Sequence, residues 1–186
     1  MRGKRRMMRA LVRAVVLLAG MGLVVPAAAQ NSDLLERALA SAVDSFERAL
    51  PTLGDEVFGV DVAAYRDALS LQRFSSERWG GTVHVAIEMQ AGEGGQCARF
   101  AAFTRVPPQD SVVPLVLGPR FFAPGAEGLR TLTILHEMVH VVAGTDECRA
   151  MAFAAAVERQ AMGQWTPVDA YWRASGCQGS GFELPE

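Results

Sequence analysis

The stretch from Thr131 to Gly144, TLTILHEMVHVVAG, constrains this chain more than any other. It holds two of the three histidines, His136 and His140, with Glu137 between them in the pattern H-E-x-x-H. On a helix, residues four apart lie on one face, about 6 Å apart at their β-carbons. Two imidazoles placed in this way can bind one metal ion. Glu137, turned about 100° from the first histidine, can reach a water molecule on that metal.

Glu137 is the only charged side chain between Leu132 and Val142, and neither proline nor glycine interrupts this stretch. Burying a lone carboxylate in an apolar helix costs free energy unless the carboxylate has a partner or a task. We therefore predict a metal site with His136 and His140 as ligands. The alternative interpretation is a pair of core histidines that bind nothing.

The first 29 residues have the parts of a secretory signal peptide. The basic start MRGKRRMMR is followed by an apolar run over residues 10–25 and by three alanines at 27–29. Arg13 interrupts the apolar run and leaves it too short to span a bilayer comfortably. We expect cleavage after Ala29, export to the periplasm or the medium, and no stable membrane anchor afterwards.

The predicted mature chain, residues 30–186, has the size and composition of one folded domain. Its 157 residues are enough for a hydrophobic core, and the 50% hydrophobic content of the whole chain argues against disorder. Cleavage removes six basic residues and no acidic ones, so 12 bases remain against 20 acids, a net charge of −8. This charge argues against nucleic acid or an anionic membrane as a partner.

Hydrophobic periodicity predicts two helices before a short sheet and further helices after it. β-Branched residues and glycine turns predict three strands, the first two joined as a hairpin across the glycine cluster 91–95. Pro114 lies in the third strand and cannot donate to a ladder, so we expect this strand to be an edge strand or to be bulged. The predicted helices are 32–50, 62–71, a metal-site helix starting within 126–129 and ending near 143, 147–162 and 167–174; the predicted strands are 82–90, 96–106 and 111–117.

These elements place the chain in the α+β class, with a short, mostly antiparallel sheet of about three strands. The helix that carries the histidines would end at Gly144, because glycine suits the position after a helix. The next helix would begin at Glu147, with Thr145 or Asp146 as its cap. The two helices would form a tight hairpin, which places the first turn of the second helix beside His140.

A catalytic zinc ion usually has three protein ligands and one water, so a third ligand is needed. The predicted hairpin favours Glu147, which would lie within about one turn of the level of His140. Asp146 matches another ligand spacing, but that spacing requires glycine where Ala143 stands, and we interpret Asp146 chiefly as a helix cap. Glu158 would lie more than a turn beyond the histidines.

The three cysteines all belong to the predicted mature chain, and an oxidising compartment favours one disulfide and one remaining thiol. Cys148 adjoins Glu147, and the short helix 167–174 would bring Cys177 back towards it. A bond between these two cysteines would pin the ligand-bearing turn and contribute roughly 3 kcal/mol by loop entropy. The alternative pair is Cys97–Cys148.

The pattern at 136–140, followed by Glu147-x-x-Ala150 on the next helix, resembles the small zinc metallopeptidases of the gluzincin type, within the zincins. The resemblance covers roughly residues 80–163. The H-E-x-x-H pattern is specific, whereas the second pattern is weak and lies closer to the first than in most gluzincins. The resemblance implies a zincin-like fold with N-terminal helices, a short sheet, the H-E-x-x-H helix and a glutamate helix.

The resemblance also implies an activity, the hydrolysis of peptide bonds by an exported zinc enzyme. Zn²⁺ would be held by His136, His140 and Glu147 and would activate a water molecule, with Glu137 as the general base. A peptide or protein substrate would lie extended along the edge strand, for which residues 111–117 are the expected segment.

Many zincins place a tyrosine, histidine or arginine where it stabilises the oxyanion. Each candidate here also has an ordinary structural interpretation. Two alternative functions remain: a binding protein on the same scaffold without activity, against which the intact Glu137 argues, and a metal-dependent amidase acting on cell-wall peptides. The oxyanion candidates are Tyr171, Arg173, Arg120 and His84.

Overall fold

Helices and short strands alternate along residues 27–186, which are the residues that the computed structural model describes. The α+β class is confirmed. The predicted signal peptide lies mostly outside the described residues, and its predicted cleavage point falls in the first turn of α1. The helices are α1 (Ala27–Ala49), α2 (Val62–Leu69), α3 (Glu127–Ala143), α4 (Glu147–Met162) and α5 (Asp169–Ala174); the strands are β1 (Glu56–Val57), β2 (Val60–Asp61), β3 (Phe74–Ser76), β4 (Gly81–Met89), β5 (Ala102–Thr104) and β6 (Val112–Leu117).

The main sheet has four strands in the order β3-β4-β6-β5, and its central pair is parallel. β3 runs antiparallel to β4, and β5 runs antiparallel to β6. The sheet is mostly antiparallel, as predicted, because two of its three strand pairs are antiparallel. It has four strands rather than about three, and the predicted hairpin after β4 is wrong. The chain after β4 forms a 3₁₀ turn (Gly95–Ala98) and then β5, which lies on the far side of β6. This long connection lets β4 and β6 run in the same direction.

β6 lies inside the sheet, so the prediction that residues 111–117 form an edge strand is also wrong. Pro114 is tolerated there because its nitrogen faces β5 at a point where the pairing of the two strands has ended. The last residue pair between β5 and β6 is Thr104 with Leu115. The backbone N–H of Arg105 donates to the Pro114 carbonyl oxygen at 3.0 Å, and Pro114 has no N–H to return the bond. The ladder stops at this point, and β5 is the edge strand beside it.

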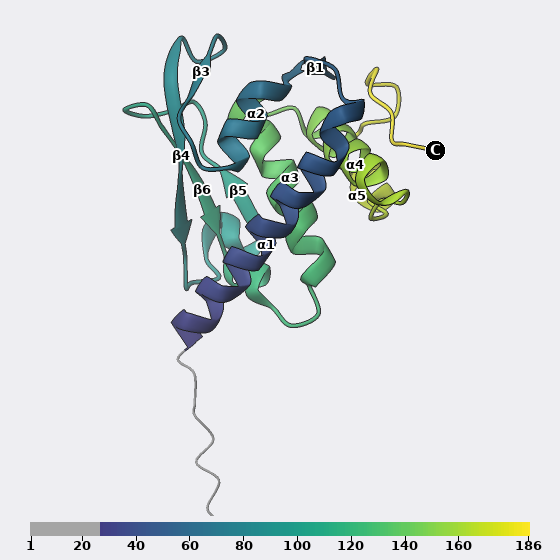
Figure 1. The fold of residues 1–186 in the computed structure, drawn as a ribbon. Coiled ribbons are helices and arrows are strands. Elements are labelled where there is room, and N and C mark those ends of the chain that lie inside the picture. The colour runs from purple at the N-terminus through teal and green to yellow at the C-terminus, as the bar shows by residue number, and fades with distance from the viewer. Residues whose placement is uncertain (1–26) are drawn as a thin grey trace, which may run out of the picture.

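The helices form a layer around α3, which is the most buried helix of the described chain (Figure 1). α1 crosses α3 and α4, α2 packs on α3, and α3 also contacts the edge strand β5. Tyr65 of α2 is fully buried between the rings of Phe46 and Phe153, and its hydroxyl donates to the Leu135 carbonyl oxygen at 2.8 Å. This arrangement packs α3 against three helices, and β5 lies beside a further face of α3.

Most local expectations about the helix ends are confirmed. The Asp61 side chain caps α2 by accepting from the N–H of Ala64, and α3 ends at Gly144, whose φ is +86°. The described chain is already helical at Ala27, five residues before the predicted start of this helix. Within the described residues, no helix is long and apolar enough to cross a bilayer.

The disulfide between Cys148 and Cys177 is present, which excludes the alternative pair with Cys97. Cys97 is a buried thiol that contacts the side-chain oxygen of Gln90 at 3.2 Å. A disulfide of this kind is typical of proteins from an oxidising compartment.

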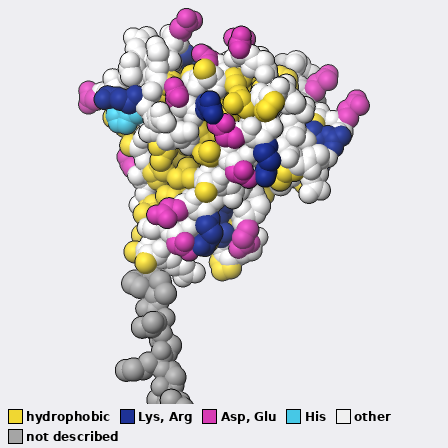
Figure 2. Space-filling view, viewed as in Figure 1, with side chains coloured by type: hydrophobic (Ala, Val, Ile, Leu, Met, Phe, Trp, Pro, Cys, Tyr) yellow, Lys and Arg dark blue, Asp and Glu magenta, His cyan; other side chains and the backbone are white. Residues whose placement is uncertain are grey.

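Basic side chains on the face in Figure 2 are scattered, and several lie beside acidic ones. Three ion pairs of the described chain follow helical spacing on α1 or join α1 to α2. Because these pairs are exposed to solvent, each contributes little to stability. The pairs are Arg37–Asp33, Arg48–Asp44 and Arg66–Glu47.

Candidate metal centre

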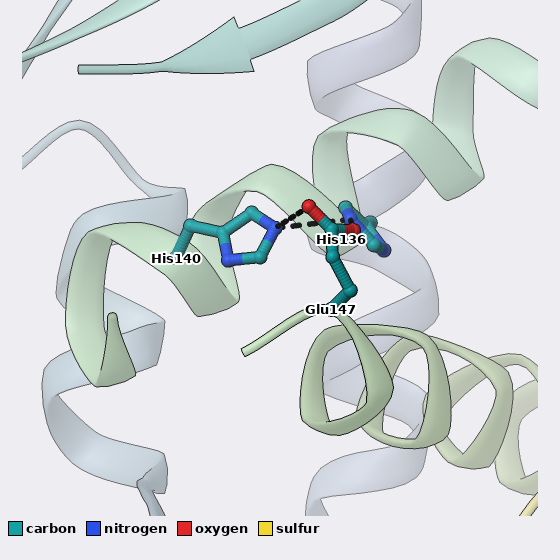
Figure 3. Close-up of side chains that lie close together, drawn as sticks. All are labelled: His136, His140 and Glu147. Carbon is teal, nitrogen blue, oxygen red and sulfur yellow. Dashed lines mark hydrogen bonds and ion pairs between the residues drawn. The ribbon is translucent and has the colours of Figure 1, made fainter. Parts of the chain in front are cut away.

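Three side chains from two helices converge at the turn between α3 and α4 (Figure 3). His136 and His140 lie on one face of α3, and Glu147, the first residue of α4, faces both rings. The Nε2 atoms of the two histidines are 3.1 Å apart. The Glu147 oxygens lie 3.1 Å from Nε2 of His136 and 3.5 Å from Nε2 of His140.

These separations match the spacing of ligand atoms around a small tetrahedral ion. With metal–ligand bonds of about 2.0–2.2 Å, two corners of a tetrahedron lie roughly 3.3–3.6 Å apart. The two nitrogens are at nearly this spacing, each has a Glu147 oxygen at a similar distance, and one ligand atom from each of the three residues lies within 4.8 Å of the others. The cluster could therefore hold a metal ion with two nitrogen ligands and one carboxylate oxygen.

His140 is oriented by the turn that follows its own helix. Its Nδ1 lies 2.9 Å from the carbonyl oxygen of Gly144, and the N–H on Nδ1 donates to that oxygen. This bond leaves the lone pair of Nε2 directed at the centre of the cluster, which is the usual arrangement of a metal-binding histidine. Gly144 thus both ends α3 and holds a ligand in place, a role that its sequence position alone does not reveal.

The charges of the cluster support one another. Burial acts to raise the pKa of Glu147, but the hydrogen bonds and charges of His136 and His140 outweigh it and hold this pKa far below its ordinary value. Burial acts to lower the pKa of His140, but the Glu147 hydrogen bond and the Glu137 charge raise it overall. A carboxylate that stays ionised beside two imidazoles is a ready ligand for a cation.

Glu137 lies beside the cluster rather than in it. Its side chain is only 7% exposed, and its Oε2 has no hydrogen-bond partner among the described residues. Burial raises the pKa of Glu137 against the lowering effect of the two histidines. Buried oxygens without a partner are rare in folded proteins, so this one points to a group that binds in the site.

Tyr171 is the one oxyanion candidate that reaches the cluster. Helix α5 brings its hydroxyl to Oε2 of Glu147, to which it donates at 3.0 Å. Burial and the Glu147 charge raise the pKa of this hydroxyl, so it remains a hydrogen-bond donor. The other three candidates, His84, Arg120 and Arg173, line neither of the two cavities described below.

The two rival carboxylates have other tasks. Asp146 caps α4, because its side chain accepts from the N–H of Arg149 at 3.0 Å. Glu158 is buried away from the histidines and accepts from the N–H and the hydroxyl of Thr166, at 2.7 and 3.2 Å. Glu147 is therefore the carboxylate that the fold brings to His136 and His140.

Two adjoining cavities open beside the cluster and share Glu137 and Tyr171. One, of about 340 Å³, is mainly apolar and extends from His136 towards α5. The other, of about 260 Å³, is more polar and extends from His140 along β5. The edge strand beside the site is thus β5, whereas the sequence indicates residues 111–117.

Comparisons with family models, with curated proteins and with solved structures found no match for this chain. The residues of the site provide three groups that could bind one metal ion, a buried carboxylate with an unpaired oxygen, a phenol that donates a hydrogen bond, and open space on both sides.

Proposed function

We propose that the protein is an exported zinc metallopeptidase that hydrolyses peptide bonds at the cluster of His136, His140 and Glu147. The observation that supports this most is the position of Glu137. An unpaired and buried carboxylate oxygen lies beside three groups spaced for one metal ion. A metal site of purely structural purpose would have no use for this carboxylate.

Zinc fits the ligand set better than the common alternatives. Mg²⁺ and Ca²⁺ favour six or more oxygen ligands, whereas the cluster offers two imidazole nitrogens and one carboxylate. Three protein ligands leave one tetrahedral position open, which is typical of catalytic rather than structural zinc. When bound, zinc would polarise the scissile carbonyl and acidify a water molecule.

The side chains of the chain itself supply the proton transfers. Glu137 accepts a proton from the attacking water and passes it to the leaving amine. Its raised pKa suits both directions of this transfer, because a stronger base accepts the proton readily and the protonated form still donates it. The hydroxyl of Tyr171 supplies a hydrogen-bond donor beside Glu147.

An extended peptide has a place beside β5. The N–H of Arg105 and the carbonyl oxygen of Ala101 bond to the chain on the β6 side. By strand alternation, the backbone groups of Ala102 and Thr104 face the opposite side, towards the polar cavity that both residues line. The N–H of Thr104 already bonds to Glu137, so a substrate strand can pair with the Ala102 groups and the Thr104 carbonyl oxygen while its scissile bond lies over the metal centre.

The substitution Glu137→Gln tests the proposal, because it removes the base and keeps the size of the side chain. We expect the variant to keep about one zinc ion per chain and to lose peptidase activity at least roughly 100-fold, measured with casein or a quenched fluorescent peptide. Glu127→Gln, at the exposed start of the same helix, is the control and should stay active. Full activity in Glu137→Gln would refute the proposed role.

A further inference from the structure

Helix α5 and its flanking residues, 166–177, form a strap that is anchored to α4 at both ends. At the start of the strap, Thr166 is bound to Glu158 in the second half of α4, through its N–H at 2.7 Å and its hydroxyl at 3.2 Å. At the end of the strap, the disulfide binds Cys177 to Cys148 in the first turn of α4, with the two α-carbons 5.3 Å apart. The strap therefore runs back along α4 towards the metal cluster.

Between its two anchors the strap is weakly held. All six residues of α5 are at least partly exposed to solvent, and a helix of this length is not stable by itself. Val168, just before α5, packs against the core but is only partly buried. Beyond the strap, the ring centre of Phe182 lies 5.6 Å from the guanidinium carbon of Arg149, so the tail keeps a contact with α4. The position of the strap therefore depends on its anchors, of which the disulfide is the covalent one.

Tyr171 lies in the middle of the strap and faces the metal cluster. Its hydroxyl donates to Oε2 of Glu147 at 3.0 Å, and the centre of its ring lies 6.3 Å from that of His136. The same residue lines both cavities beside the cluster. A shift of the strap would remove a hydrogen bond from a predicted ligand and open both cavities to water. The energy typical of a hydrogen bond to a charged group corresponds to roughly 10- to 100-fold in rate.

The three predicted ligands do not depend on the disulfide. His136 and His140 lie on α3, and Glu147 is the first residue of α4. The turn between the two helices is fixed by the conformation of Gly144 and by the side-chain cap of α4. The ligands can therefore converge in the reduced chain, whereas Tyr171 belongs to the strap that the disulfide anchors.

The disulfide can be opened from the side of Cys148. Cys148 is partly exposed, whereas Cys177 is fully buried, so the thiolate of a dithiol reductant attacks the sulfur of Cys148. A new S–S bond forms there, the bond to Cys177 breaks, and Cys177 leaves as a thiolate that takes up a proton. The second thiol of the reductant then releases Cys148 and closes the disulfide of the reductant. In the reverse reaction, a protein disulfide of an oxidising compartment accepts the two electrons and two protons and becomes a dithiol.

We propose that the disulfide between Cys148 and Cys177 is a redox latch that completes the active site only in an oxidising compartment. In the reduced form, which is that of a newly made chain in the cytosol, the strap is loose and Tyr171 leaves Glu147. Zinc is bound in this form, but peptide hydrolysis is slow. After export, closure of the disulfide fixes the strap beside the cluster. This inference rests on the proposed peptidase function and names its regulation.

Activity and zinc content test the latch when both are measured on the same samples, below the Tm of every form. The samples are the oxidised wild type, the wild type after treatment with a phosphine reductant, and the double variant Cys148→Ser, Cys177→Ser. We expect both disulfide-free forms to keep about one zinc ion per chain and to cleave a fluorescent peptide at least roughly tenfold more slowly than the oxidised wild type. Reoxidation of the reduced wild type should restore its rate.

Cys97→Ala is the control for the remaining thiol, and it should respond to the reductant as the wild type does. Equal rates in the oxidised and disulfide-free forms would overturn the inference. Loss of zinc from the disulfide-free forms would also overturn it, because the disulfide would then act through the metal site and not through the strap.

Tyr171→Phe tests whether the latch acts through the tyrosine. In the oxidised protein, this change should slow cleavage at least roughly tenfold, because the hydrogen bond to Glu147 is lost. In the disulfide-free double variant, it should have less than about a twofold further effect, because the hydroxyl is already displaced. Ala174→Ser, exposed on the same helix and outside both cavities, should leave both rates unchanged. Effects of Tyr171→Phe that are equal in the two forms would overturn the inference.

Hydrogen exchange followed by mass spectrometry tests the latch without relying on turnover. In the zinc-loaded, disulfide-free forms, we expect the amides of residues 166–177 to exchange at least roughly tenfold faster than in the oxidised wild type, while the amides of α3 stay protected on that time scale. If exchange responds in this way but the oxidised, zinc-loaded wild type cleaves no peptide, the latch stands and the peptidase function fails. If the oxidised protein cleaves peptides and neither exchange nor rate depends on the disulfide, the peptidase function stands and the latch fails.

Discussion

Gly144 joins the two helices of the metal cluster through a backbone conformation that glycine alone adopts readily. Its φ of +86° and ψ of −169° lie in a region that side chains strongly disfavour. A β-carbon at this position would also displace the guanidinium of Arg78. Since its carbonyl oxygen accepts from His140, strain at this residue would reach the metal ligand directly.

Gly144→Ala should therefore destabilise the protein by about 1–3 kcal/mol and weaken zinc binding. The measurements are urea unfolding and competition for zinc with a chelator. Gly128→Ala, inside α3 with open space around it, is the control and should raise stability by about 0.5–1 kcal/mol. Equal effects of the two substitutions would show that the turn is not under this constraint.

The substitutions Glu147→Ala and Asp146→Ala test which of the two carboxylates binds the metal and which one only caps α4. Loss of Glu147 should lower zinc affinity at least roughly 100-fold, because one of three protein ligands disappears. Loss of Asp146 should cost about 1 kcal/mol of stability through the lost cap and leave the zinc content unchanged. Metal analysis after dialysis decides the matter, and release of zinc by the Asp146 change alone would contradict the assignment.

The side chain of Glu158, away from the metal centre, should make the stability of the fold depend on pH. Burial raises its pKa above the ordinary value of 4.5, so the folded state holds this proton more tightly than the unfolded state. The resulting stability is fully present below the unfolded pKa and is lost as the pH rises through the folded pKa.

Glu158→Gln removes this titration and keeps an acceptor for Thr166, so its unfolding free energy should fall less than that of the wild type as the pH rises from 4 to 7. Urea unfolding across this range measures the difference. Glu36→Gln, exposed on α1, serves as the control and should follow the wild type. A parallel fall in all three proteins would exclude Glu158 as the source.

Among the helices, the sequence predicts the convergence of His136, His140 and Glu147 because the governing interactions are local. The spacing of His136 and His140, the glycine after α3 and the cap of α4 each act within about one turn, and together they place Glu147 opposite the histidines. Tyr171 could only be one candidate among several, because its contact with Glu147 depends on how a loop returns α5.

The sheet is where sequence reasoning fails, because strand pairing is non-local. The glycine cluster 91–95 has the composition of a hairpin turn, yet the chain passes it and forms a 3₁₀ turn before β5. Pro114 has the signature of an edge strand, yet it lies in a central strand at the point where the neighbouring strand ends. Neither outcome follows from the residues near those positions.

The disulfide links α4 to the segment just after α5 and should contribute to stability without binding metal. Cys148 and Cys177 are 29 residues apart, which corresponds to about 3–4 kcal/mol by loop entropy. The double change of both cysteines to serine should lower Tm by several degrees or more, with zinc still bound. Dithiothreitol should lower the Tm of the wild type and of the control Cys97→Ala alike. An unchanged Tm in the double variant would show that the link contributes nothing.

At the level of the molecule, the helical layer supports the metal cluster, and the edge strand β5 and helix α5 lie beside it. The disulfide fits an oxidising compartment, which agrees with the export expected from the N-terminal sequence. One helix hairpin therefore carries all three predicted ligands and the proposed general base, and the cavities beside it offer space for the proposed substrate.

The most direct test of this account is the zinc content of the purified protein, measured by mass spectrometry of the metal after exhaustive dialysis. We predict about one zinc ion per chain in the wild type and less than roughly a tenth of that in a His136→Ala, His140→Ala double variant. A wild-type protein that retains no zinc, or a double variant that retains all of it, would contradict the central claim.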